Sequence, residues 1–97
     1  EVVLLIYEDG HVTKEILFHS NSYMQKRLNS WLESNDKNWT YSLDTFVPRM
    51  YFRSKGISLN FMENMAVLNY SQWSDGQYTQ IYKKVDAAAV RNELFKR

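Results

Sequence analysis

The chain has 97 residues, of which 44% are hydrophobic and 24% charged, and its formal net charge at pH 7 is +1. This length fits one domain with one core, and this composition is that of a globular protein rather than a disordered one. A charge so near zero supplies no general attraction to nucleic acid or anionic lipid. The absence of cysteine excludes disulfides and thiolate metal sites, and no apolar run reaches the length of a membrane-spanning helix. We therefore expect residues 1–97 to form a single domain that does not enter a membrane.

The first predicted element is a β-hairpin over residues 2–18, with its turn at Asp9-Gly10. Asp-Gly between two apolar segments is the strongest short hairpin signal, and a two-residue type I′ turn places Val3 opposite Ile16. Both faces of the first strand are apolar, as expected for an interior strand covered on both sides. This register predicts that the main core lies on one side of the hairpin, the side of Val3, Leu5, Val12 and Ile16.

Two helices are predicted, each with a marked start and one apolar stripe. Residues 22–34 begin with a capping box, in which the Ser22 hydroxyl and the Gln25 amide satisfy backbone N–H groups. Residues 87–96 follow Asp86, which serves as the N-cap. The stripes that pack on a sheet are Met24, Leu28, Trp31 and Leu32 in the first helix, and Ala87, Val90 and Leu94 in the second.

Between the helices, alternating residues predict four or five strands, from the segments around residues 39–44, 49–53, 57–61, 65–70 and 77–85. Pro48 cannot donate to a sheet ladder, so no central strand is expected at its position. The resulting order, ββαββββα, predicts an α+β domain. Its antiparallel β-meander sheet would have five or six strands, with both helices packed on one face.

Residues suited to catalysis or metal binding are few. His11 and His19 stand at opposite ends of one predicted strand, roughly 25 Å apart, so they cannot share a metal ion. No glycine pair has the spacing of a phosphate-binding loop, and no carboxylate pair has a diagnostic spacing. A carboxylate pair assembled only by the tertiary structure stays open. We predict a non-enzymatic protein without cofactor or metal.

The segment after Pro48 predicts a basic and aromatic strand face formed by Arg49, Tyr51, Arg53 and Lys55. An aromatic ring between cations can stack a base while its neighbours hold phosphates, as in proteins that bind single strands. Lysine and arginine are also common on edge strands, where they prevent edge-to-edge aggregation, and tyrosine is ordinary on a solvated strand face. The face is therefore a candidate binding site for single-stranded nucleic acid or for an anionic protein partner. A plain solvated surface is the commoner explanation of such a pattern.

A second aromatic group comprises Tyr70, Trp73, Tyr78 and Tyr82. Tyrosine and tryptophan supply many of the residues that dominate binding energy at protein interfaces. These rings could instead fill the space between the sheet and the second helix. Because the chain is nearly neutral, we predict a small protein-interaction module of inhibitor, immunity or adaptor type that uses this group. Single-stranded nucleic-acid binding through the basic face is the alternative, and the oligomeric state stays open.

Overall fold

The structure is a computed structural model that describes residues 1–71 and 78–95. Within these residues, seven strands form one antiparallel sheet in the order β2-β1-β4-β5-β6-β7-β3, and two helices pack on one of its faces. The strands are β1 (Val2–Glu8), β2 (His11–Phe18), β3 (Thr40–Tyr41), β4 (Met50–Ser54), β5 (Ile57–Phe61), β6 (Met65–Tyr70) and β7 (Thr79–Lys84), and the helices are α1 (Tyr23–Ser34) and α2 (Ala87–Leu94).

The α+β class, the meander and the placement of both helices on one face are as predicted. The sheet has more strands than the five or six expected because the two-residue β3 pairs with β7 and becomes the far edge. Among the described residues, no helix combines the length and the apolar character that crossing a bilayer requires.

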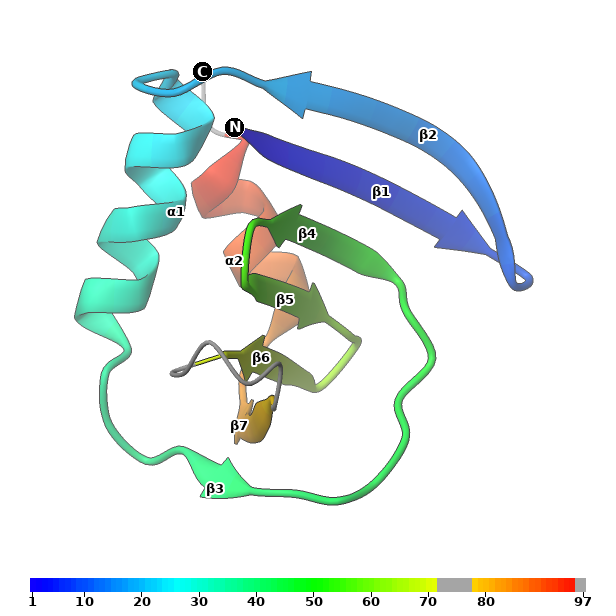
Figure 1. The fold of residues 1–97 in the computed structure, drawn as a ribbon, viewed down its shortest axis with the longest axis vertical. Coiled ribbons are helices and arrows are strands. Elements are labelled where there is room, and N and C mark those ends of the chain that lie inside the picture. Colours follow the sequence, from blue (N-terminus) through cyan, green and yellow to red (C-terminus); the bar gives the residue numbers. More distant parts are fainter. Residues whose placement is uncertain (72–77, 96–97) are drawn as a thin grey trace.

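The chain wraps around its own sheet. Figure 1 shows the strands stacked from β2 at the top to β3 at the bottom, with α1 on the left and the segment between β3 and β4 on the right. The β1–β2 hairpin forms one edge, and α1 then carries the chain across to β3 at the other edge. Residues 42–49, which we call the strap, return it to β4 in the interior of the sheet.

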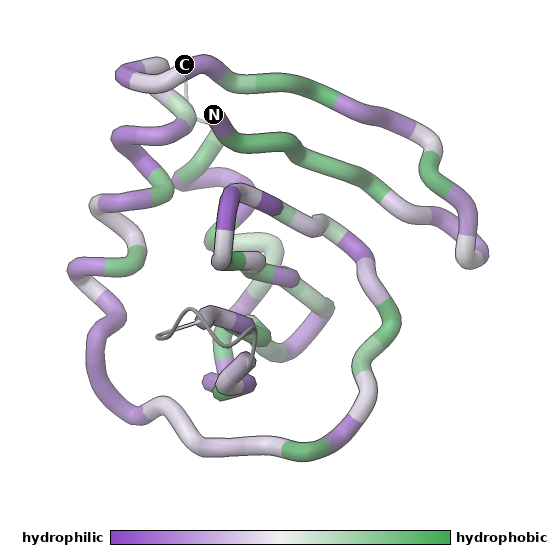
Figure 2. Tube along the Cα trace, viewed as in Figure 1, coloured by the Kyte–Doolittle hydropathy of each residue, from purple (hydrophilic) through white to green (hydrophobic). Residues whose placement is uncertain are grey.

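The main core lies between the helices and the sheet. The predicted stripes supply Met24, Leu28 and Trp31 from α1 and Val90 and Leu94 from α2. Figure 2 shows β1 as an almost unbroken hydrophobic run, whereas hydrophilic and hydrophobic residues alternate along α1. This pattern fits an interior strand beneath an amphipathic helix.

An aromatic cluster holds α1 against the sheet. Trp31 is only 3% exposed. Its ring meets those of Trp39 and Phe61 edge to face, at centroid distances of 6.2 and 4.9 Å. Edge-to-face pairs of this kind add to the free energy gained from apolar burial. The predicted packing of both helices through Trp31 and Leu94 is confirmed.

The predicted register of the hairpin is wrong beyond its turn. Asp9 and Gly10 both have positive φ, as a type I′ turn requires. The register then shifts by one residue, so that Thr13 is an extra residue and Leu4, not Val3, pairs with Ile16. A bulge of one residue exchanges the two faces of the strand that follows it.

The main core also lies on the opposite face of β1 from the one predicted. The side toward the helices carries Val2, Leu4 and the partly buried Ile6, together with Ile16. The predicted core side of Val3, Leu5 and Val12 is wrong, because these residues belong to the face away from the helices. Leu5 is nevertheless buried there, so that second face is covered in part.

Helix caps are local features, and they follow the prediction with one exception. The Asp86 side chain accepts hydrogen bonds from the backbone N–H groups of Ala88 and Ala89. The Ser22 hydroxyl accepts from the Gln25 N–H, but the Ser22 N–H donates to the His19 carbonyl instead of to Gln25. The second half of the predicted capping box is therefore wrong.

We predict that Trp31→Ala lowers the free energy of unfolding by about 3–5 kcal/mol, the range for a buried large aromatic side chain. Urea unfolding followed by circular dichroism measures this change. Leu43→Ala is the control, because Leu43 is fully exposed and its loss should alter stability by no more than about 0.5 kcal/mol. Equal effects of the two substitutions would contradict the packing of α1 through Trp31.

Candidate functional site

The strap lies over the face of the sheet that the helices leave uncovered. Asn60 alternates along β5 with Leu59 and Phe61, which face the helices, so its side chain points to the opposite face. The Asn60 side chain is buried, with 4% of the residue exposed. Its Oδ1 accepts from the Arg49 N–H at 2.9 Å, and its Nδ2 donates to the Val47 carbonyl at 3.1 Å. One side-chain amide thus closes the strap onto the centre of the sheet.

A second amide holds the start of the strap near the edge of the sheet. The Gln80 Nε2 donates to the carbonyls of Asp44 at 2.7 Å and Ser42 at 3.3 Å. The Ser42 N–H donates to the Gln80 carbonyl at 3.1 Å. Between these anchors, Phe46 borders the same hollow as Val67, which is 1% exposed. The strap therefore buries part of this face as a small second core.

The rest of this face forms a groove. Two hollows of about 350 and 390 Å³ adjoin, because both are lined by Tyr51, Arg53 and Asn69. The first is bounded by Phe46 of the strap and the second by Tyr78. We call the combined feature the open-face groove, with the defining residues Tyr51, Arg53, Ser58, Asn69 and Tyr78.

The floor of the open-face groove is a row of polar side chains on three neighbouring strands. Arg53 of β4 pairs with Ser58 of β5, and Ser58 pairs with Asn69 of β6. Within the described residues, none of these three side chains makes a hydrogen bond or an ion pair. The floor of the groove thus presents a guanidinium, a hydroxyl and an amide, and the rings of Tyr51 and Tyr78 lie beside them.

The predicted basic face is only partly assembled. Tyr51 and Arg53 lie in the open-face groove, whereas Arg49 borders a different hollow that also includes Glu8 and Glu63. Lys55 is exposed in the turn between β4 and β5. The proposed guard against edge-to-edge aggregation does not apply, because β4 lies inside the sheet between β1 and β5.

The predicted aromatic group is divided between the two faces. Tyr78 is 64% exposed and borders the open-face groove. Tyr82 is half-buried opposite Val67, on the strap side of the sheet. Tyr70 follows Leu68 by two residues and so belongs to the helix side, where it is half-buried. Trp73 lies outside the described residues.

The sequence analysis did not single out Ser58, Asn69 or the two amides that anchor the strap. Alternation along the predicted strand of residues 57–61 already separates Ser58 and Asn60 from its apolar residues. The alternation predicts which face of the sheet Ser58 and Asn60 belong to. It does not predict that the strap, which is distant in the sequence from β5, covers Asn60.

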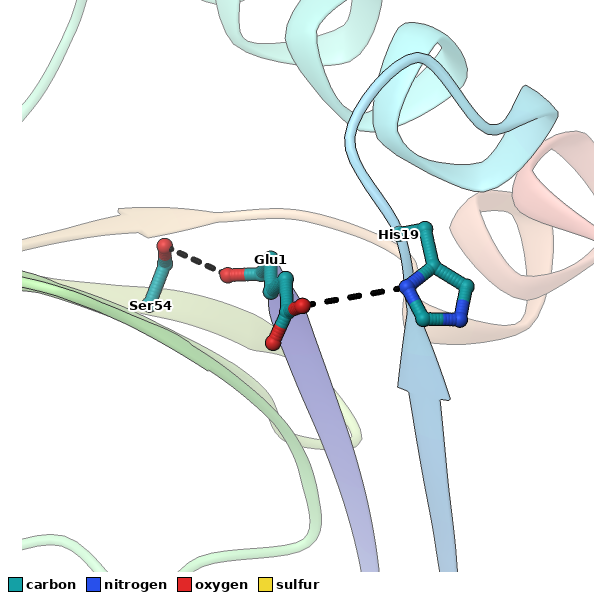
Figure 3. Close-up of polar contacts among 3 residues, drawn as sticks. All are labelled: Glu1, His19 and Ser54. Atoms are coloured by element: carbon teal, nitrogen blue, oxygen red, sulfur yellow. Dashed lines mark hydrogen bonds and ion pairs between the residues drawn. The ribbon is translucent and has the colours of Figure 1, made fainter.

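The two histidines lie apart, as predicted, at opposite ends of β2. Figure 3 shows His19 beside Glu1, with Nδ1 at 3.8 Å from the Glu1 Oε1, while the Ser54 hydroxyl donates to the Glu1 carbonyl at 2.8 Å. Both side chains are largely exposed, and exposed pairs of this kind contribute little to stability. In the described part of the chain, no three histidine, aspartate or glutamate side chains are grouped so that they could hold a metal ion.

Comparison of the chain with protein-family models, with curated proteins and with solved structures gave no match. The functional argument therefore depends on the geometry and chemistry of the site.

We predict that Asn60→Leu lowers the free energy of unfolding by about 2–4 kcal/mol. It removes two hydrogen bonds and leaves a strap N–H and a strap carbonyl without their partner. Asn69→Leu on the neighbouring strand is the matched control, since the Asn69 side chain makes no hydrogen bond within the described residues. Urea unfolding measures both variants. If Asn69→Leu lowered the free energy of unfolding as much as Asn60→Leu does, the Asn60 amide would not be the group that holds the strap.

Proposed function

We propose that this domain is a non-enzymatic protein-interaction module that binds its partner in the open-face groove. One observation carries the proposal: Tyr78 of the aromatic group lies in the same groove as Tyr51 and Arg53 of the basic strand. Tyrosine and arginine are among the residues that most often dominate binding energy at protein interfaces. A protein of inhibitor, immunity or adaptor type would bind its partner through such a surface.

The groove is suited to binding because its floor belongs to the rigid part of the fold. Arg53, Ser58 and Asn69 sit on three consecutive paired strands, and β4 and β5 are interior to the sheet. Backbone that is already ordered loses little conformational entropy when a partner binds. The Arg53 guanidinium makes no ion pair with another described residue, and it would suit a carboxylate on the partner, since arginine and carboxylate form strong, often bidentate hydrogen bonds.

A protein partner is favoured over single-stranded nucleic acid by the number of cations in the groove. Of the three cations in the predicted basic face, only Arg53 lines the groove, because Arg49 borders another hollow and Lys55 lies in a turn. Affinity for nucleic acid arises mainly from phosphate contacts and the counterions they release. One guanidinium beside two tyrosines releases too few counterions for tight binding at physiological salt.

We predict that the double substitution Tyr51→Ala and Tyr78→Ala abolishes capture of the partner. The wild-type domain is immobilised, exposed to lysate of its source cell, and the captured proteins are quantified by mass spectrometry. Capture should fall about 30-fold or more, the effect of losing one dominant side chain worth about 2 kcal/mol. The matched control is Tyr23→Ala with Tyr41→Ala, because both tyrosines are highly exposed and neither lines the groove.

A titration with mixed-sequence single-stranded oligonucleotides at about 50 and 200 mM salt tests the alternative. The protein-partner proposal expects no low-micromolar binding at the higher salt concentration. Low-micromolar binding that disappears in the Arg53→Glu variant would instead assign the groove to nucleic acid. Circular dichroism of each variant verifies that the fold is intact.

A further inference from the structure

The two edges of the sheet differ in length. The edge strand β3 has two residues, whereas β2 at the other edge has eight and is the outermost strand in Figure 1. A short edge strand is one of the ways in which proteins prevent an unpaired edge from joining another chain. No strand of residues 1–71 and 78–95 pairs with the outer side of β2, and its bulge at Thr13 interrupts only the part near the turn. Residues 14–18, which we call the open edge, therefore form a regular strand with one unpaired side.

The hydrogen bonds of β1 show which backbone groups of the open edge point outward. The Tyr7 N–H donates to the Arg49 carbonyl at 2.9 Å, so the backbone groups of Tyr7 point toward β4. Because these groups alternate along a strand, those of Leu4 point toward β2, where Leu4 pairs with Ile16. The groups of Ile16 point back toward β1. The residues whose N–H and carbonyl groups point outward are therefore Glu15 and Leu17.

We propose that the open edge pairs with the open edge of a second copy of this chain, antiparallel and centred on Ile16. In this register Glu15 of each copy lies opposite Leu17 of the other. Each of these two pairs exchanges both of its N–H···O bonds, which uses the groups that point outward. The sheets of the two copies then join into one continuous sheet.

The charges of β2 select this register. Centring on Glu15 would place two carboxylates opposite each other, and centring on Lys14 would place two ammonium groups opposite each other and include the bulge. Centring on Leu17 would use only residues 16–18 of each strand. When the pairing is centred on Ile16, no charge lies directly opposite a like charge. Lys14 then lies opposite Phe18 of the second copy, and the ring of Phe18 attracts a cation.

The apolar residues favour a second copy over an unrelated strand. Ile16 and Phe18 lie on the helix side of the sheet, packed against the main core but only partly buried. In the proposed register the two Ile16 side chains face each other at a position without hydrogen bonds, where opposite side chains are closest. On the other face, Leu17 is 50% exposed. The pairing therefore continues the main core of one copy into that of the other.

The proposal goes beyond the function assigned to the open-face groove and does not depend on it. A two-fold axis that places Ile16 opposite its own copy is perpendicular to the sheet, so both grooves open on the same side of the joined sheet. No described residue of β2 lines the groove. The double substitution Tyr51→Ala and Tyr78→Ala should therefore leave dimerisation unchanged. Loss of partner capture and loss of the dimer are then separate results.

The first test is sedimentation velocity from about 10 μM to about 1 mM. We expect a monomer–dimer equilibrium with a dissociation constant on the order of 0.1 mM, as suits an interface below the standard size. In NMR spectra the amide signals of Glu15 and Leu17 should shift as the concentration rises. The Ile16 amide should shift less, because it already points toward β1. A domain that stays monomeric at about 1 mM would overturn the proposal.

A charge exchange at position 17 tests the register. Leu17→Lys places a lysine opposite Glu15 of the second copy twice in the dimer, and it should tighten the dimer about fivefold. Leu17→Glu places carboxylates there and should weaken the dimer by a similar factor. The double substitution Leu17→Glu and Glu15→Lys should restore wild-type affinity. Equal affinities of the Leu17→Lys and Leu17→Glu variants would show that the register is wrong.

Proline tests the backbone bonds directly. Leu17→Pro removes an N–H that points outward and should weaken the dimer about tenfold or more, while proline is tolerated on an edge strand. The matched control is Tyr41→Pro on the other edge. The Ser42 N–H donates to the Gln80 carbonyl of β7, so by alternation the Tyr41 N–H also points away from the sheet. Tyr41→Pro should leave the dimer intact, and circular dichroism verifies the fold of both variants.

A dimer that survives Leu17→Pro would contradict pairing through β2. One further outcome would assign the edge to a different occupant. If the Glu15 and Leu17 amides became protected from hydrogen exchange only after a captured partner was added, the added strand would come from that partner, and the proposal of a second copy would be wrong.

Discussion

The buried amide of Asn60 is the contact on which the second face of the sheet depends. It bonds one carbonyl and one N–H of the strap at once, so the strap cannot shift without leaving buried polar groups unpaired. The strap leads directly into β4, which pairs with β1 on one side and β5 on the other. The same amide therefore positions the strand that joins the β1–β2 hairpin to the rest of the sheet.

The two faces of the sheet have different chemistry because different segments cover them. Two helices bury most of the apolar side chains on one face, such as Phe52 and Phe61. The strap is a single extended segment and covers only part of the other face. What it leaves open is the polar row of Arg53, Ser58 and Asn69, which is the surface that we propose for a partner and which lies on the other side of the sheet from the main core.

Much of the fold could be predicted because the signals are local. Asp9-Gly10 adopts the positive φ values that the dipeptide favours, and Asp86 caps α2 through its own side chain. The stripe that includes Trp31 needs only the period of a helix to identify its buried side. Of the candidate site, Tyr51, Arg53 and Tyr78 were predicted, but in two separate groups. Alternation along one strand cannot show which strands become neighbours.

What the sequence determined by itself is the class of the domain, its helices, its turns and a set of candidate binding residues, because each follows from neighbours within a few positions. The tertiary structure decided the rest. The extra residue at Thr13 exchanged the faces of β2, and the return of the strap over Asn60 divided the second face. Both depend on contacts between segments that are distant in the chain. Such contacts depend on how much apolar surface the whole fold buries and on whether its buried polar groups are hydrogen-bonded. The conformational preferences of neighbouring residues do not determine them.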